Sequence, residues 1–358
     1  MSLRAAVGAA ALVAAVFLAA CGRQAPEAAR PLEPSPAART TDAGATGVDE
    51  AIVLAVGILP QAFLLQRVGG QRVEVLVLVE QGHSPATYEP TARQMAQLAR
   101  ARTYFSIGLP FEEALLERIG ETMPGLKVVD TREGIKLRET ETGTHGAHGH
   151  GGAEQQDAQE APVAAEPGED GEPEAASPLP VLQGEPTMDP HVWLDPRNAK
   201  RIAHTMQREL VRLDPEGSER YEQNLQALDA ELDRLHATIS RILKPLAGSE
   251  LLVYHPAFGY LADAYGLRQI AIETEGKEPG PKELASIVQK ARASGARVVF
   301  VQPEFADSAA RAIAEAIGGA VVPINPLSGD YIENLAEMAA TIKSGLVGVS
   351  DRRPEQDE

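Results

Sequence analysis

Short runs of β-branched and aliphatic residues alternate along most of this chain with longer stretches whose apolar residues recur every three or four positions. The short runs predict buried strands, and the longer spacing predicts helices. In the first half we expect strands at 52–56, 73–79, 104–107 and 127–129, with helices opening at Pro60 and covering 91–102 and 111–119. In the second half we expect strands at 251–254, 269–272, 297–301 and 320–324, with helices over 257–265, 281–293, 308–317 and 331–346. Near-continuous apolar strands that alternate with helices are typical of parallel sheets covered on both faces.

A long helical region, 197–246, separates the two series and is interrupted at Asp214-Pro215. Asp214 is expected to cap the next helix, and Pro215 to occupy its first turn. A continuous helix of roughly 30 residues is about 45 Å long, which is more than a small domain needs. The predicted fold class is therefore α/β, with two parallel-sheet lobes joined by a long backbone helix. Ligands of open sheets bind at the carboxyl ends of the strands, so we expect the binding cleft between the lobes.

The first residues of the chain have the pattern of an export signal. Residues 1–20 combine Arg4 with an apolar run that is too short to span a bilayer. Small residues precede Cys21, as in the lipobox of bacterial lipoproteins, so we expect this single cysteine to be lipidated and to form no internal disulfide. Residues 21–48 are rich in Pro, Ala, Thr and Gly and predict a flexible tether.

A second unusual segment lies before the long helical region. Between Glu139 and Pro196 there are thirteen Asp or Glu residues, four His residues and no Lys or Arg. Residues 140–180 have too few large apolar side chains to pack, so we expect a mobile insertion there. Its histidines His145, His148 and His150 are either weak auxiliary metal ligands or part of a neutral low-complexity tract.

These observations give a complete predicted organisation. It consists of a signal peptide (1–20), a tether (21–48), a first lobe (49–213), a linking helix (214–247), a second lobe (248–348) and a tail (349–358).

The formal charge of −18 argues against nucleic acid or anionic lipid as a partner and suits a protein that gathers cations.

Three histidines stand in loops that are favourable for metal binding. His83 follows the predicted strand at 73–79, His255 follows the strand at 251–254, and His191 lies in a proline-flanked loop after the insertion. For a single histidine, a place in the core or at a surface turn is the more common role. Imidazoles from three separate segments are what a zinc site requires, and a chain with one cysteine has to build such a site from His and carboxylate ligands. We therefore predict that His83, His191 and His255 bind one metal ion.

Four motifs resemble the zinc and manganese solute-binding lipoproteins of ABC transporters, the ZnuA/TroA-like family. They are Gly82-His83-Ser84-Pro85-Ala86-Thr87-Tyr88-Glu89-Pro90, Asp189-Pro190-His191-Val192-Trp193-Leu194-Asp195-Pro196, Tyr254-His255-Pro256-Ala257-Phe258-Gly259-Tyr260-Leu261 and Asn325-Pro326-Leu327-Ser328-Gly329-Asp330-Tyr331. The resemblance covers essentially the whole chain after the tether. It implies two α/β lobes joined by a backbone helix, a metal in the cleft between them, and delivery of that metal to a membrane permease.

Two motifs depart from the usual family pattern. In the first motif a histidine normally follows the proline directly, whereas this chain has Ala86 there and His83 three residues earlier. In the fourth motif an aspartate normally stands where this chain has Asn325, whose amide oxygen is a neutral and weaker ligand. The fourth ligand is therefore water, Asn325 or a nearby carboxylate, with Glu304 as the leading candidate. The alternative role of Glu304 is that of a charge at a helix N-terminus.

The sequence leaves three functions open. Three imidazoles and few oxygen ligands favour Zn²⁺ over Mn²⁺ as the transported ligand. A zinc-dependent hydrolase is the rival, but we find no Gly-x-Ser-x-Gly or His-Glu-x-x-His motif, so we expect no enzyme. A third possibility keeps the fold and binds an iron chelate or another small solute. We predict a high-affinity zinc-binding lipoprotein, monomeric and anchored outside the cytoplasm, in the periplasm or at the cell surface, that delivers zinc to an ABC transporter permease.

Overall fold

The structure is a computed structural model that describes residues 51–140, 188–273, 280–305 and 308–347. The described residues belong to one compact unit. The predicted signal peptide and tether, residues 141–180 of the predicted insertion and the tail lie outside the described residues, and so do Cys21, His145, His148 and His150.

The first sheet is built from the first half of the chain, and all of its strands are parallel. Its order is β2-β1-β3-β4, and Leu54 of β1 lies between Val75 of β2 and Thr103 of β3. Three helices and a 3-10 turn connect the strands. The elements are β1 (Ile52–Val56), α1 (Leu59–Gly69), η1 (Gly70–Arg72), β2 (Val73–Val77), α2 (Ala92–Leu98), β3 (Thr103–Ser106), α3 (Glu112–Thr122) and β4 (Lys127–Asp130).

The second sheet repeats this topology in the second half of the chain. Its order is β6-β5-β7-β8, again all parallel, so the first strand of each series lies between the second and the third. The elements are β5 (Glu250–Val253), α6 (Gly259–Tyr265), β6 (Arg268–Ala271), α7 (Pro281–Ser294), β7 (Val298–Val301), α8 (Ser308–Ile317), β8 (Ala320–Pro323) and α9 (Tyr331–Val347). The predicted fold class, with two parallel-sheet α/β lobes, is thereby confirmed.

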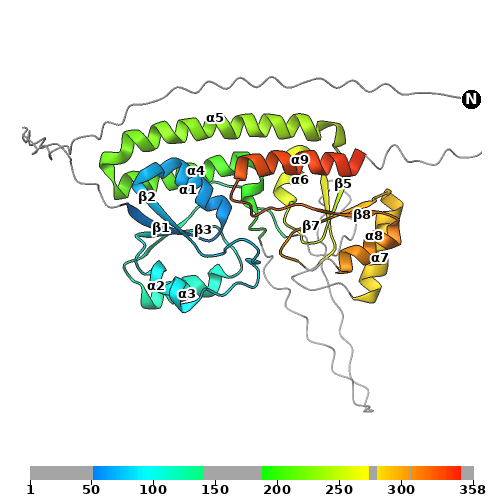
Figure 1. The fold of residues 1–358 in the computed structure, drawn as a ribbon, viewed down its shortest axis with the longest axis horizontal. Helices are drawn as coiled ribbons and strands as arrows, with labels where there is room; N and C mark the ends of the chain where they lie inside the picture. The colour runs from blue at the N-terminus through cyan, green and yellow to red at the C-terminus, as the bar shows by residue number, and fades with distance from the viewer. Residues whose placement is uncertain (1–50, 141–187, 274–279, 306–307, 348–358) are drawn as a thin grey trace, which may run out of the picture. The chain divides into compact units, whose positions relative to one another are not determined.

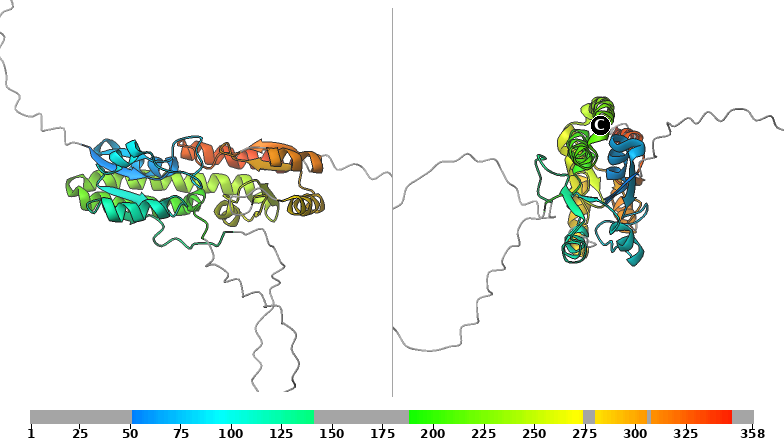
Figure 2. Two further views of the ribbon diagram at one scale, coloured as in Figure 1. Left: turned by 90° about the horizontal axis from the view of Figure 1, so that it is seen from below. Right: turned by 90° about the vertical axis from the view of Figure 1, so that its left-hand side faces the viewer.

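Two long helices connect the sheets. The connecting elements are η2 (Val192–Leu194), α4 (Pro196–Leu213), η3 (Pro215–Gly217), α5 (Ser218–Leu243) and η4 (Lys244–Leu246). Helix α5 packs on α1 and α4 beside the first sheet and on α6 and α9 beside the second, and it runs past both sheets in Figure 1 and Figure 2. Asp214 caps the turn at η3, as expected, because its side chain accepts a hydrogen bond from the Gly217 amide.

The core shows that strands of the second sheet are buried on both faces. In β5, Leu251 and Val253 belong to the large apolar cluster that also contains β1 and α5, whereas Leu252 belongs to a separate cluster with α8. In β7, Val298 and Phe300 face the large cluster, and Val299 and Val301 face the smaller one. Because side chains alternate along a strand, a sheet covered by helices on both sides requires the unbroken apolar runs seen in the sequence.

The predicted elements are found, with shifted ends. Strand β2 ends at Val77 rather than Val79, although Leu78 and Val79 still donate to the Val56 and Gly57 carbonyls. Helix α2 is shorter than the predicted 91–102, because the Arg102 amide already donates to the Val53 carbonyl of β1. Both shifts occur at a boundary between a strand and the segment next to it, and the spacing of apolar residues does not locate that boundary.

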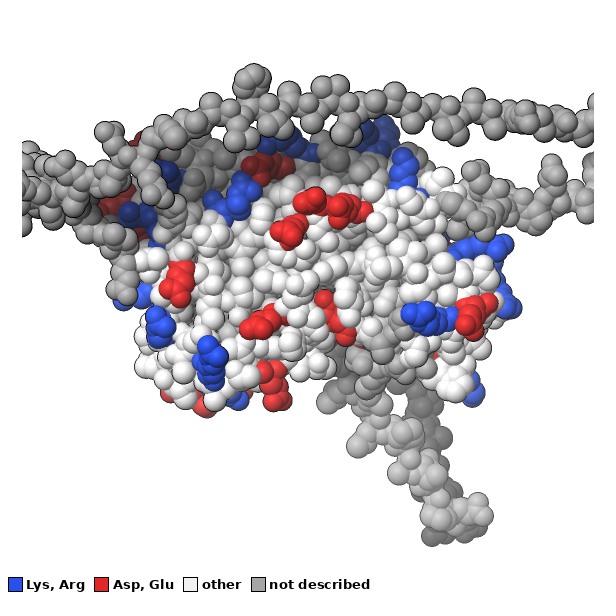
Figure 3. Space-filling model, in the orientation of Figure 1, with Lys and Arg blue, Asp and Glu red and all other residues white. Residues whose placement is uncertain are grey.

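The described residues contain no helix that is both long enough and apolar enough to cross a membrane. On the face shown in Figure 3, Asp and Glu side chains are scattered over a largely uncharged surface, and Lys and Arg side chains lie mostly nearer its edges. The described residues on that face therefore form no continuous basic track of the kind that binds nucleic acid.

A buried carboxylate ties α4 to the first sheet. Glu209 of α4 accepts hydrogen bonds from Thr103 Oγ1 at 2.9 Å, from Lys127 Nζ at 2.7 Å and from Arg212 Nη2 at 2.7 Å. Burial alone raises the pKa of Glu209, but the hydrogen bonds from Arg212, Lys127 and Thr103 outweigh burial and lower the pKa to about 2. The charged form of this side chain is therefore part of the folded structure.

Glu209→Gln is expected to lower the free energy of unfolding at pH 7 by about 2 kcal/mol, because hydrogen bonds to a charged group are lost. The folded-state pKa lies below the unfolded value, so the contribution is complete above about pH 4.5 and decreases as the pH falls towards 2. Urea unfolding at pH 7 and pH 3.5 should show a smaller difference between wild type and variant at the lower pH. Equal differences at both pH values would contradict this role, and the exposed Glu219→Gln variant is the control.

Candidate metal centre

His255 lies at the carboxyl end of the second sheet, two residues after β5. Its Nδ1 is 3.2 Å from Oε2 and 3.3 Å from Oε1 of Glu273, which follows the neighbouring strand β6. Glu273 is 3% exposed and the His255 side chain 18%. Since a carboxylate only accepts hydrogen bonds, the imidazole proton belongs on Nδ1, and Nε2 keeps a lone pair available for a metal.

His191 is held by the same kind of contact in a different segment. Its Nδ1 lies 2.8 Å from Oδ1 of Asp189, and its backbone amide donates to the same oxygen at 2.9 Å. Asp189 is 2% exposed, and the His191 side chain is 15% exposed. Burial lowers the pKa of His191 below its usual value, although Asp189 opposes this. His191 is therefore neutral near pH 7, which is the form that binds metals.

The two imidazoles lie next to each other. Their ring centroids are 5.4 Å apart and the rings are nearly perpendicular, at 75°. Aromatic rings cover both, with Phe305 stacked on His255 at 4.9 Å and Trp193 against His191 at 5.2 Å. Each imidazole thus has one nitrogen turned to a buried carboxylate, and the rings are confined by neighbouring aromatic side chains.

The loop with His191 is fixed by the C-terminal motif. Trp193, which is fully buried, donates from Nε1 to the Pro326 carbonyl at 2.8 Å. The hydroxyl of Tyr331 donates to the Trp193 carbonyl at 2.5 Å. The second and fourth sequence motifs therefore meet.

Two unpartnered oxygens follow β7, the strand beside β5. Oε1 of Gln302 and Oε2 of Glu304 are buried and accept no hydrogen bond from the described residues. Nε2 of Gln302 donates to the His255 carbonyl at 3.1 Å, which places this loop against His255. Burial raises the pKa of Glu304, and the proximity of His255 opposes the rise. In open parallel sheets the usual ligand site is the crevice at the carboxyl ends of two neighbouring strands where the strand order reverses, and β5 and β7 are such a pair.

The other two predicted ligands are placed differently. His83 is exposed in the loop after β2, with its ring edge-on to Tyr88 at 6.0 Å. Oδ1 of Asn325 accepts from the Leu327 amide at 2.8 Å, and the Asn325 carbonyl accepts from Asn334, so this residue shapes a turn. Within the described parts of the chain, no three His, Cys, Asp or Glu residues are grouped so as to hold a metal ion. The structure thus brings His191 and His255 together without a complete ligand set.

The carboxylates that orient the two histidines could not be identified from the sequence. Asp189 stands two residues before His191 in the same motif, and Glu273 follows β6, the strand that pairs with β5, just as His255 follows β5. The adjacency of β5 and β6 was available from the order of elements. The direction in which each loop side chain turns could not be predicted, because the spacing of residues in the sequence does not encode it.

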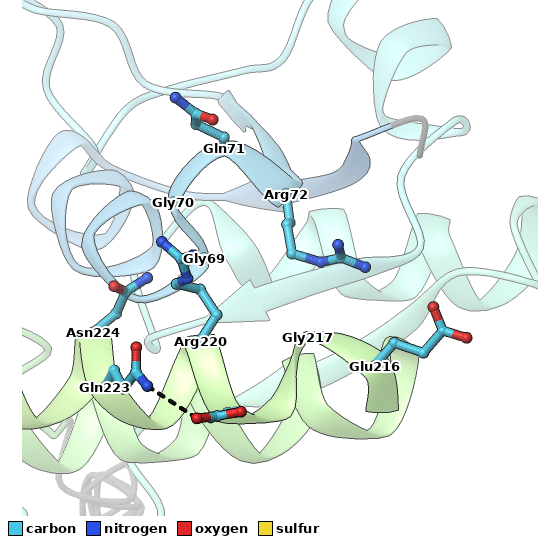
Figure 4. Close-up of a pocket in the computed structure, with 10 residues that line it drawn as sticks. Gly69, Gly70, Gln71, Arg72, Glu216, Gly217, Arg220, Gln223 and Asn224 are labelled. Atoms are coloured by element: carbon cyan, nitrogen blue, oxygen red, sulfur yellow. Dashed lines mark hydrogen bonds between the residues drawn. The ribbon is translucent and has the colours of Figure 1, made fainter. Parts of the chain in front are cut away.

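A cavity of about 690 Å³ lies elsewhere, where η1 meets the start of α5 (Figure 4). It is lined by Gly70, Arg72, Arg220, Gln223 and other residues, which include glutamates but no histidine. Arg72 already pairs with Asp214 at 2.6 Å. This cavity therefore offers no imidazole ligand for a metal.

Comparison with known proteins identifies the family. The chain matches the family model described as "ZnuA: Zinc-uptake complex component A periplasmic" over residues 55–345. The high-affinity zinc uptake system protein ZnuA of Bacillus subtilis (strain 168) is 32% identical over 144 residues, which are 40% of this chain and 45% of that protein. The chain spans about half the length of these curated relatives.

Solved structures match over a larger part of the chain. A crystal structure of ZnuA is 34% identical with a TM-score of 0.69, and the match covers 83% of this chain and 99% of that one. A crystal structure of a ZnuA deletion mutant with zinc bound is 33% identical with a TM-score of 0.67, covering 83% and 98%. The resemblance found in the sequence motifs is confirmed, and the chain belongs to the family of ZnuA, the periplasmic component of zinc-uptake complexes.

Proposed function

We propose that this protein binds Zn²⁺ outside the cytoplasm and delivers it to the permease of an ABC transporter. The observation that carries the proposal is the pair His191 and His255, each with Nδ1 turned to a buried carboxylate and Nε2 left for a metal. A histidine that donates its second nitrogen to a carboxylate is the usual arrangement around bound zinc. The family and the zinc-binding relative support the same metal.

The proposed ligand set is His191, His255, Glu304 and His83. Glu304 is supported by its buried, unpartnered oxygen next to His255. His83 would add a third imidazole, and nitrogen-rich sets favour zinc over manganese, which prefers oxygen. Asn325 has the weakest support among the predicted ligands, because its side-chain oxygen already accepts a hydrogen bond.

The remaining sequence predictions belong to the same proposal. We infer a monomer that is anchored through a lipid on Cys21 and faces the periplasm or the cell surface. His145, His148 and His150 would act only as weak auxiliary ligands, because small residues separate them on a segment that has few apolar side chains.

His191→Ala is expected to weaken zinc binding by on the order of 100-fold or more, because a direct ligand is lost where even indirect partners contribute 10- to 100-fold. Isothermal titration with a competing chelator, on a chain lacking residues 1–48 and 140–180, measures this without the His-rich segment. His236→Ala is the matched control. His236 is a histidine of α5 whose Nδ1 lies 3.1 Å from the hydroxyl of Tyr265 on α6. Unchanged affinity in His191→Ala would refute the site.

Glu304→Gln is expected to weaken zinc binding by about tenfold or more, because a neutral amide replaces an anionic ligand of nearly the same shape. The same chelator competition measures the change, with the exposed Glu219→Gln variant as control. Equal affinities for the variant and the wild type would remove Glu304 from the ligand set.

Zinc affinity is expected to stay nearly constant from pH 8 to about 6.5 and to fall at lower pH, as protons compete for the imidazoles. Because burial lowers the pKa of His191, its neutral form is present above that pKa, and its contribution is lost only as the pH falls through it. Chelator competition at pH 7.5, 6.5 and 5.5 tests this. Affinity that does not change down to pH 5.5 would contradict binding through imidazole.

A further inference from the structure

Asp189 divides its two carboxylate oxygens between different partners. Oδ1 accepts from the His191 amide at 2.9 Å and faces His191 Nδ1 at 2.8 Å. Oδ2 lies 3.3 Å from Nη1 of Arg138. A carboxylate held at both oxygens cannot rotate freely, so the orientation of the His191 ring depends on what holds Oδ2.

Arg138 is itself fixed between two parts of the molecule. The next residue, Glu139, forms an isolated antiparallel β-bridge with Met188, and the Arg138 carbonyl accepts a hydrogen bond from the Asp189 amide at 2.9 Å. On the other side, its Nε lies 3.2 Å from Oδ2 of Asp263 on α6. The Arg138 amide also donates to the Tyr260 hydroxyl at 3.1 Å, which in turn donates to the Asp189 carbonyl at 3.2 Å. Backbone and side chain of Arg138 together join the Asp189 segment to α6.

A glycine provides the space for this guanidinium. A Cβ added to Gly259, the first residue of α6, would overlap Nη1 of Arg138 and would lie 2.8 Å from Oδ2 of Asp189. Gly259 has no positive φ that would otherwise require glycine. The close approach of Arg138 and Asp189 is therefore the constraint on this position.

We propose that Arg138 is a positioning residue of the metal site, which holds Asp189 so that His191 keeps its proton on Nδ1 and presents Nε2 to the metal. The inference rests on the proposed zinc-binding function. It concerns a residue that touches no metal and acts only through Asp189.

The positive charge of Arg138 and its positioning of Asp189 lead to opposite predictions for zinc affinity. A guanidinium near the site repels a cation, so a role limited to charge predicts tighter zinc binding when Arg138 is neutralised. Positioning predicts weaker binding, because the released carboxylate no longer fixes the imidazole. Asp189 and Asp263 both contact the guanidinium and screen its charge, which makes the positioning effect the larger one.

The test compares zinc affinity, measured by chelator competition, in the full wild-type chain and in Arg138→Met. We expect Arg138→Met to bind zinc 10- to 100-fold more weakly, as is usual for partners of a metal-bound histidine. Gly259→Ala, which displaces the guanidinium while keeping its charge, should weaken binding in the same direction. Arg67→Met is the control, because it breaks a comparable pair with Glu231, at 2.7 Å, between α1 and α5. Unchanged or tighter binding in Gly259→Ala or in a folded Arg138→Met would overturn the inference.

A second measurement separates this inference from the proposed function. Imidazole ¹⁵N chemical shifts of the metal-free protein at pH 7.5 report which nitrogen of His191 carries the proton. We expect the Nδ1-protonated form in the wild type and in Arg67→Met, and a mixture of tautomers in Arg138→Met and Gly259→Ala. The same tautomer in all four proteins would refute the role of Arg138. A wild-type chain that shows these shifts but binds no zinc would refute the proposed function alone.

Discussion

The site depends on the removal of two adjacent imidazoles from water. His191 and His255 are mostly buried with their rings 5.4 Å apart, so protonating both would place two poorly solvated positive charges side by side. Neutral rings avoid this repulsion, but each then needs a partner for its remaining N–H group. Asp189 and Glu273 are those partners, and they also decide which nitrogen stays free. A metal-binding surface thus follows from satisfying buried polar groups.

The fold provides these partners because of its strand order. β5 lies between β6 and β7, so the loops after all three strands meet at one end of the second sheet, where His255, Glu273 and Glu304 are found. His191 comes from outside this sheet and is brought to it by Trp193, whose indole and carbonyl bind Pro326 and Tyr331. The fourth motif therefore holds the loop that carries His191, while the Asn325 side chain forms a turn within the motif itself.

The sequence allowed the strands, the helices and the fold class to be predicted, because apolar periodicity reports burial directly. It also identified His191 and His255, because each stands next to a proline in a loop beside buried segments. It could not reveal Asp189, Glu273 or Arg138 as their partners, since those contacts depend on how side chains turn within loops. The same limit applies to His83, a residue that was predicted to bind the metal. It follows a strand as expected, but β2 is an edge strand of the first sheet, and the local sequence does not show which way the loop after it faces.

The local charge of the site explains a preference for divalent cations better than the overall charge of −18 does. Exposed charges at a distance are screened by salt, whereas buried ones are screened much less. Asp189 and Glu273 are buried, and Glu304 adds a carboxyl group whose pKa is raised by burial. The guanidinium of Arg138 contacts one of these carboxyl groups, that of Asp189. A cation beside His255 would stabilise the charged form of Glu304 and so offset the energetic penalty of burying this carboxylate.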